Sequence, residues 1–376
     1  MTDTDRSEGV LKAAGVTGRT VNVHAHLMSW SWLKVAPTPS GSDGGAAVRR
    51  ANYEDAAKGS AKSSYNAIAE TRATLANIVT DDEKARLDDL DARRRSTSSL
   101  MEHAAIHVDE MDEAGLDSMV SNLMDHGDFS ESTSVMKYAI PFEQVLEETA
   151  EVRAAFPGRF EMTAGVNPRR PGAPALLEKS VREYGALALG EMTATMFRTM
   201  PTDRDLCYPL YEKACELGVP MMHDATMPLG YSDPHIFEQL ATDFPELQIC
   251  LGGCGLGVNP VDGPDGELAA PERMLQLACE YSNIWLDLDD WQRRDDAGKS
   301  YYVDFLKRAL ASDAREKVMF GSDYPVFNWM YSEGGWVKAI LDHANAVGQQ
   351  IPLEDLELFF SRNALRFLGL EAKIVA

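Results

Sequence analysis

The feature that most restricts the fold of this chain is a regular alternation of short apolar segments with longer amphipathic ones. The alternation repeats eight times after residue 19. The short segments are bounded by Gly, Pro or Asp, as expected of parallel strands buried on both faces. The longer segments have apolar residues at helical spacing. Eight such pairs predict an α/β fold, the (β/α)8 TIM barrel, rather than a doubly wound sheet.

The predicted elements can be placed from these patterns. We expect strands over residues 19–26, 117–124, 160–166, 186–191, 219–223, 248–252, 284–288 and 318–322. We expect helices over residues 98–113, 142–155, 175–184, 205–217, 234–244, 271–280, 301–312, 334–347 and 353–368. Gly115 stands at the position after a helix where a left-handed residue is needed.

A long polar stretch interrupts the pattern after the first strand. Residues 29–97 contain PTPSGSDGG and only weak helical patches, and connections of this length are usually functional lids or disordered. Residues 1–18 form a polar tail without the apolar run of a signal peptide. The sequence therefore predicts a single barrel domain over residues 1–376, with a lid-like insertion.

The charge of the chain excludes several classes of protein. It has 36 Lys and Arg against 59 Asp and Glu, and the net charge of −23 repels nucleic acid and anionic membranes. The sequence has no apolar run long enough to span a bilayer, and its five cysteines lack zinc-finger spacing. We expect a cytoplasmic protein with no nucleic-acid or membrane partner, and a homodimer is compatible with this composition.

Metal-binding residue types gather at the ends of the predicted strands, where a TIM barrel has its active face. The first strand ends in His24-Ala25-His26, and alternation along the strand puts both imidazoles on one side. The second, fourth, fifth and eighth strands end near His126, Glu191, His223 and Asp323. Four of the eight histidines thus lie at three strand ends, which predicts a metal site of histidines and carboxylates.

Structural roles compete with this interpretation at several positions. His126 could cap a buried loop instead of contacting a ligand. Asp287 and Asp289 lie at the end of the seventh strand, where supporting or surface roles are favoured over ligand roles. Cys254 is favoured as a buried structural cysteine.

Several of these segments carry a family resemblance. VNVHAH, PMMHDA, FPELQICLGG, FGSDYP and the closing SRNALRFLGL resemble the amidohydrolase superfamily, in the branch that includes aminocarboxymuconate semialdehyde decarboxylase. The likeness extends over about residues 20–370, apart from the polar stretch. An HxH pair with a distant GSDYP is specific for the fold and the metal site, but not for the reaction.

The resemblance implies a set of site residues and a chemistry. His24, His26, His223 and Asp323 would bind a divalent Zn, Mn or Fe ion, and Asp323 and His223 would be catalytic. Asp323 would position a metal-bound water or accept its proton. The implied enzyme hydrolyses, or decarboxylates, a small organic acid, amide or lactone.

Substrate-binding residues are expected among the side chains that follow the strand ends. His126, Arg198 and Trp329 are the candidates. Aromatic residues such as Trp329 suit an apolar or aromatic substrate. Arg198, like Arg169 and Arg170, could hold a substrate carboxylate.

The chain departs from the family at the sixth strand. Relatives carry a histidine in a segment like LGHxGG, whereas this chain has Gly252 and Gly253 there. Other candidate ligands are Glu191, where dinuclear relatives hold a bridging carboxylate, and His103 with His107.

His103 and His107 are four residues apart on one helical face, a spacing that can chelate a metal. The competing interpretation is an exposed polar helix face. The alternative function is therefore a dinuclear non-haem iron monooxygenase on an amidohydrolase-like barrel, hydroxylating an apolar natural-product intermediate. The expected cofactor is one or two divalent metal ions.

Overall fold

The computed structural model describes residues 9–29, 32, 81–127, 129–134, 138–226, 230–255, 270–289, 301–324, 331–346 and 350–371. Its strands are β1 (Val21–Ala25), β2 (Ser118–Ser121), β3 (Phe160–Met162), β4 (Leu189–Met192), β5 (Met221–Asp224), β6 (Ile249–Gly252), β7 (Ile284–Leu288) and β8 (Val318–Phe320). They form two parallel sheets, in the orders β1-β2-β3 and β4-β5-β6-β7-β8.

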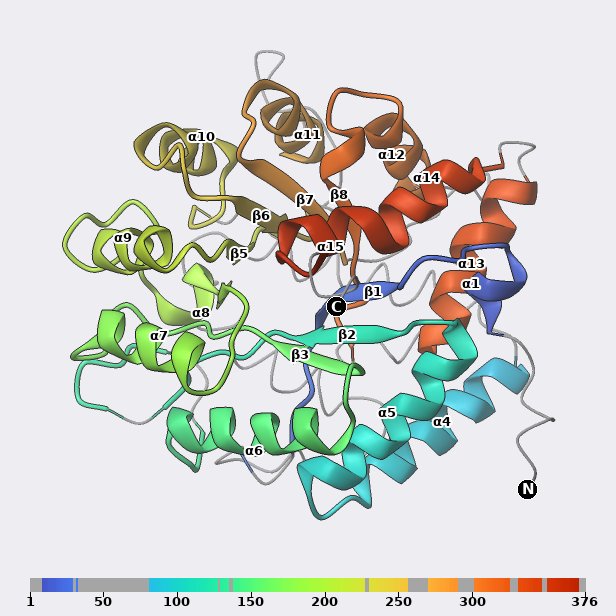
Figure 1. The fold of residues 1–376 in the computed structure, drawn as a ribbon, viewed down its shortest axis with the longest axis horizontal. Coiled ribbons are helices and arrows are strands. Elements are labelled where there is room, and N and C mark those ends of the chain that lie inside the picture. Colours follow the sequence, from blue (N-terminus) through green and yellow to red (C-terminus); the bar gives the residue numbers. More distant parts are fainter. Residues whose placement is uncertain are drawn as a thin grey trace.

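Two seams join these sheets into one barrel. Ala164, after β3, pairs with Leu189 of β4, and Ala25 of β1 pairs with Tyr324, after β8. The strands therefore follow their sequence order around the barrel, and helices surround them (Figure 1). The predicted TIM-barrel fold is confirmed.

The helices follow the predicted alternation. They are α1 (Val10–Ala13), α4 (Asp81–Arg95), α5 (Leu100–Ala114), α6 (Phe142–Ala155), α7 (Ala173–Arg182), α8 (Ala194–Phe197), α9 (Tyr208–Leu217), α10 (Pro234–Asp243), α11 (Ala270–Glu280), α12 (Tyr301–Leu310), α13 (Glu333–Ala346), α14 (Leu353–Glu357) and α15 (Asn363–Phe367). A π-helical turn, Leu358–Arg362, links the last two. Gly115 ends α5 with a φ of 79°, as predicted.

The C-terminal segment fills one end of the barrel. Leu365 and Phe367 of α15 pack in one cluster with Val21, Trp285 and Met319 from the strands. The Trp285 and Phe367 rings lie 5.3 Å apart. Because this apolar plug lies at the strand N-termini, a functional site is left to the opposite end, where the strands finish.

The described end of the insertion belongs to the outer helical layer. α4 buries Leu87, Leu90 and Arg94, a stripe at helical spacing, and it packs on α5. Arg94 Nη2 lies 2.5 Å from Glu110 Oε1 of α5, and both side chains are at most 4% exposed. Residues 33–80 lie outside the described part of the chain, so a lid role for the insertion stays a prediction.

Replacing Arg94 with methionine is expected to lower the free energy of unfolding by about 3 kcal/mol, because it leaves the Glu110 carboxylate buried without its cation. Urea unfolding measures this loss. The control is Lys338→Met, which removes an ion pair whose side chains are about 60% exposed and should cost less than about 0.5 kcal/mol. Equal losses in the two variants would contradict a buried Arg94–Glu110 pair.

Candidate metal centre

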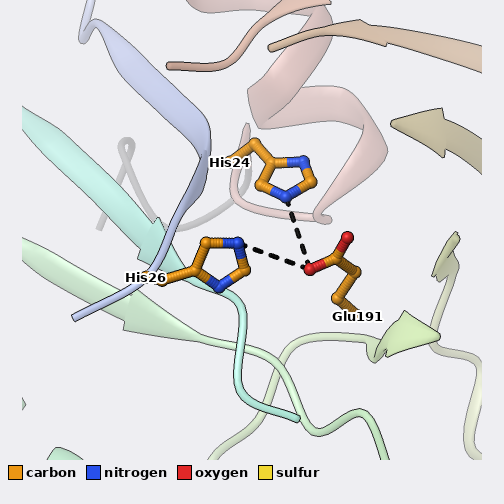
Figure 2. A group of neighbouring side chains, drawn as sticks. All are labelled: His24, His26 and Glu191. Carbon is orange, nitrogen blue, oxygen red and sulfur yellow. Dashed lines mark ion pairs between the residues drawn. The ribbon is translucent and has the colours of Figure 1, made fainter. Parts of the chain in front are cut away.

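His24 and His26 lie at the end of β1, where the strand does not run evenly beside its neighbour. Between Asn22 and Ala25, β1 advances three residues while β2 advances two, which is a β-bulge. A second irregularity of this kind lies in β4, around Glu191. Bulges redirect side chains. The side chains beside these two bulges, those of His24, His26 and Glu191, face one another (Figure 2).

Hydrogen bonds decide which ring nitrogen two of the histidines present. His26 Nδ1 lies 2.8 Å from Asn122 O, and His223 Nδ1 lies 2.8 Å from Asp224 O. Since a carbonyl oxygen only accepts, both Nδ1 atoms are donors and both Nε2 atoms keep a lone pair in the neutral ring. Nε2 is therefore the atom that these histidines can offer a metal.

Glu191 lies opposite both histidines of β1. Its Oε2 is 3.5 Å from His24 Nε2 and 3.4 Å from His26 Nε2 (Figure 2). Asp323, just after β8, places Oδ1 3.0 Å from His26 Nε2. The φ of Asp323 is 49°, a left-handed conformation that Asp adopts more readily than most residues.

These separations fit a single divalent ion. Metal bonds of about 2.0–2.2 Å at tetrahedral or octahedral angles put neighbouring ligand atoms about 3–3.5 Å apart. The His24, His26 and Glu191 side chains are at most 7% exposed. Imidazole nitrogens with carboxylate oxygens suit Zn, Mn or Fe. The residues present therefore fit the metal that the sequence predicts.

His223 is the next-to-last residue of β5, and its charge acts on Glu191. Among the described residues, the convergent sets of ligand atoms are His24, His26 and Glu191, and His24 with Asp287 and Asp289. Burial lowers the pKa of His223 to about 4 against the opposing effect of its hydrogen bond to Asp224 and of the Glu191 charge. The ring is therefore neutral, as a metal ligand must be.

Attraction between opposite charges determines the direction of the pKa shifts of Glu191 and His24. Burial alone would raise the pKa of Glu191, but the neighbouring His24, His26 and His223 outweigh it and lower that pKa to about 2. Burial alone would likewise lower the pKa of His24, but Asp289, Glu191 and Asp287 raise it well above its ordinary value. The arrangement therefore stabilises positive charge at a buried position.

Asp287 and Asp289 are buried, at 0% and 2% exposure, so a surface role is wrong for both. Both carboxylates lie against His24 Nδ1. Burial first, then like charges, raises the pKa of Asp287 and raises that of Asp289 further, despite the nearby His24 ring. The supporting role is the one that fits their position. Their spacing in IWLDLD, at every second residue toward the end of a strand, is the signal by which the sequence identified them.

His103 and His107 do not join this group. Both face inward from α5, at 1% and 0% exposure, so an exposed helix face is wrong. His103 Nδ1 donates to Met28 O over 2.7 Å, and its Nε2 accepts from the Tyr324 hydroxyl at 3.2 Å. The His107 ring packs on the Tyr324 ring, with centroids 3.6 Å apart. Burial, with the Arg94 charge adding to it, lowers the pKa of His103 to about 4.

The three candidate substrate-binding residues lie in different surroundings. His126 is fully buried, with Nδ1 2.6 Å from Ser134 Oγ and the Phe197 ring 5.7 Å away. Arg198, the residue after Phe197, is exposed. Trp329 lies outside the described residues.

Two other arginines, Arg169 and Arg170, were candidates for binding a substrate carboxylate, and both already have partners within the protein. Arg170 Nη2 lies 2.6 Å from Oδ1 of the buried Asp125. Arg169 Nε donates to Thr199 Oγ1 over 3.0 Å. A role of Arg198 in binding a substrate carboxylate stays a prediction.

The end of β6 leaves little room for a side chain. A Cβ at Gly252 would lie 3.2 Å from His24 Nδ1. A Cβ at Gly253 would lie 2.1 Å from Thr226 Oγ1 and 2.8 Å from Thr226 Cα, so a side chain there would require the backbone to move. Cys254 Sγ lies 3.2 Å from each of two backbone carbonyl oxygens, which fits the structural role expected of it.

Comparison with protein families places the chain. The amidohydrolase family profile matches residues 21–370, so the chain belongs to the amidohydrolase family. A comparison with curated proteins found no match. No helix in the described ranges is long and apolar enough to cross a membrane.

Solved structures with low sequence identity share the fold. A 5-carboxyvanillate decarboxylase from Novosphingobium aromaticivorans, with manganese and 4-hydroxy-3-methoxy-5-nitrobenzoic acid, has a TM-score of 0.53 at 14% identity, covering 98% of this chain and 100% of that one. A probable 2-pyrone-4,6-dicarboxylic acid hydrolase from Acinetobacter baumannii, with citric acid bound, has a TM-score of 0.54 at 11% identity, covering 93% and 99%. A 4-oxalomesaconate hydratase from Rhodopseudomonas palustris has a TM-score of 0.50 at 19% identity, covering 95% and 97%.

Proposed function

We propose that this chain is a metal-dependent hydrolase or decarboxylase of a small organic acid, and that His24, His26 and Asp323 hold one divalent ion. The observation that carries the proposal is the convergence of buried histidine nitrogens and carboxylate oxygens at ligand separations, at the end of the barrel left open for a site. When bound, the ion would polarise a substrate carbonyl and lower the pKa of a bound water.

The chain's own residues supply the other parts of this chemistry. Asp323, 3.0 Å from His26 Nε2, is placed to accept a proton at its carboxylate. Glu191 and His223 would complete the ligand set. His126 and Arg198 would contact the substrate, with Arg198 holding its carboxylate.

Two considerations support an organic acid as the substrate. The neighbouring decarboxylase and hydrolase structures hold manganese with an aromatic acid, and citric acid. An exposed arginine after a strand end, such as Arg198, could fix one carboxylate of such a substrate. Manganese is therefore our first choice of metal, before zinc and iron.

A dinuclear iron monooxygenase remains the alternative that experiment should exclude. The His103 nitrogens already hydrogen-bond to Met28 O and Tyr324, which favours one ion over two. A cytoplasmic location and a homodimer stay predictions.

His26→Ala is expected to weaken binding of Mn²⁺ by more than about 100-fold, since loss of a partner behind a ligand alone costs 10–100-fold. Chelator competition gives the affinity, and elemental analysis gives the metal content. His235→Ala, which removes an exposed histidine of α10, should bind like the unchanged protein.

The same preparation tests the reaction. We expect about one Mn or Zn per chain, and turnover of a hydroxybenzoate or of a dicarboxylic lactone that chelation abolishes and Mn²⁺ restores. Two iron ions per chain with oxygen consumption would instead establish the monooxygenase.

A further inference from the structure

Two carboxylates from one strand end meet a single nitrogen of His24. Asp287 Oδ2 lies 2.6 Å from His24 Nδ1, and Asp289 Oδ2 lies 2.5 Å from the same atom. In the described part of the chain, no hydrogen bond reaches the buried Oδ1 atom of either carboxylate. Both carboxylates are therefore directed at the side of His24 that faces away from Glu191.

The distances decide between a second metal site and hydrogen bonding. Ligand atoms that share one divalent ion lie about 3–3.5 Å apart, as those around Glu191 do. The separations at Nδ1 are shorter than those around Glu191 by about 0.9 Å. They lie just below the usual range of charge-assisted N–H···O bonds, and the contact with Asp287 is a hydrogen bond. A proton, rather than a metal ion, fits between His24 and these carboxylates.

Glycines on the flanking strands leave room for this contact. A Cβ at Gly321 would lie 2.4 Å from Asp287 Oδ1 and 2.8 Å from Asp289 Cβ. A Cβ at Gly252 would lie 3.4 Å from Asp289 Oδ2. The side chains of Asp287 and Asp289 thus occupy space beside His24 that would be filled if the residues at the ends of β6 and β8 were larger than glycine.

We infer that Asp287 and Asp289 are positioning residues that hold the proton of His24 on Nδ1, and so keep the Nε2 lone pair directed at Glu191 and the metal. The inference rests on the proposed function, because the position of the His24 proton matters for activity only if this site binds a metal. The contacts of the two carboxylates with His24 Nδ1 do not themselves require a metal. A carboxylate behind a metal-binding histidine fixes the tautomer and raises the ligand's donor strength.

The first test is made on the metal-free protein. The ¹⁵N signals of protonated and unprotonated ring nitrogens are well separated, so an NMR spectrum of ¹⁵N-histidine-labelled protein reports where the His24 proton lies. Loss of one pair of signals in His24→Gln assigns them. Because the carboxylates favour the doubly protonated ring, spectra are recorded as the pH is raised until the ring is neutral. We expect Nε2 to lose its proton while Nδ1 keeps its own, and a neutral ring protonated only on Nε2 would overturn the inference. This measurement needs no variant of Asp287 or Asp289.

The second test is metal affinity. Asp287→Asn and Asp289→Asn should each weaken Mn²⁺ binding by about 10–100-fold, and the double variant should also redistribute the His24 proton between Nδ1 and Nε2. Asp117→Asn is the matched control, because it removes a hydrogen-bonded carboxylate before β2, at the other end of the strands. Affinities of the two β7 variants within twofold of this control would contradict the inference.

The outcomes separate the two proposals. If the unchanged protein binds no divalent metal but its His24 proton lies on Nδ1, the proposed function fails and the positioning geometry holds. If metal binds and the proton lies on Nε2, the proposed function stands and the positioning role fails.

Discussion

Asp323→Asn is expected to reduce metal-dependent turnover by about 10²–10⁴-fold, the usual contribution of a general acid or base. The amide keeps the shape of the side chain, but it cannot accept the proton that the carboxylate takes. The side chain is 14% exposed, so the fold should survive the change. The measurement is kcat with the organic acid that the substrate panel identifies, alongside a thermal unfolding curve.

Asp313→Asn provides the matched comparison, because Asp313 is an exposed aspartate just before β8. Its turnover should equal that of the unchanged protein. If Asp323→Asn retained full turnover with bound metal, the role assigned to Asp323 would be wrong, whatever the stability of the variant.

Glu333→Gln is expected to stabilise the protein in a pH-dependent way. Glu333 begins α13 with its side chain buried, and its Oε1 accepts hydrogen bonds from Ser322 Oγ at 2.7 Å and Asn22 Nδ2 at 3.1 Å. Burial raises the pKa of Glu333 from 4.5 to about 8. The folded protein therefore binds this proton more tightly than the unfolded chain does.

The sign of the effect follows from that difference. Below about pH 4.5 both states are protonated, and Glu333 costs nothing relative to glutamine. As the pH rises toward 8, the unfolded chain gives up the proton while the folded protein must keep it, so stability is lost across this window. The loss amounts to roughly 5 kcal/mol when the pH is above 8. Glutamine, neutral at every pH, avoids it.

Urea unfolding at pH 5 and pH 9 measures the gain of Glu333→Gln over the unchanged protein. The gain should be small at pH 5 and largest at pH 9. Glu354→Gln, at an exposed position of α14, should show no such increase. A gain for Glu333→Gln that is the same at both pH values would show that the carboxyl is not held protonated by burial.

Local sequence patterns predicted much of the fold. Helix α6 and strand β7 begin and end at the predicted residues, because apolar spacing and a bounding turn are local properties of the chain. The ends of some strands differ from the predicted residues. β3 stops at Met162 rather than at residue 166, since beyond it the chain pairs through isolated bridges only.

Long-range contacts were beyond such patterns. The helical spacing of His103 and His107 identified one face of α5, but not what covers it. In the structure Tyr324, far along the chain, fills that face. The same holds for Asp287, whose partner His24 lies 263 residues away.

The sequence by itself determined the barrel and the HxH pair of β1, because both depend on residues close together in the chain. It also placed Glu191, His223 and Asp323 at strand ends, which a parallel barrel must bring to one face. Only the tertiary structure decided how these residues meet. The bulges in β1 and β4 turn His24, His26 and Glu191 toward one another. The carboxylates at the end of β7 contact His24 at Nδ1, the ring nitrogen on the side away from Glu191. Register between strands and contact across a barrel depend on packing of the whole chain, which no local pattern encodes.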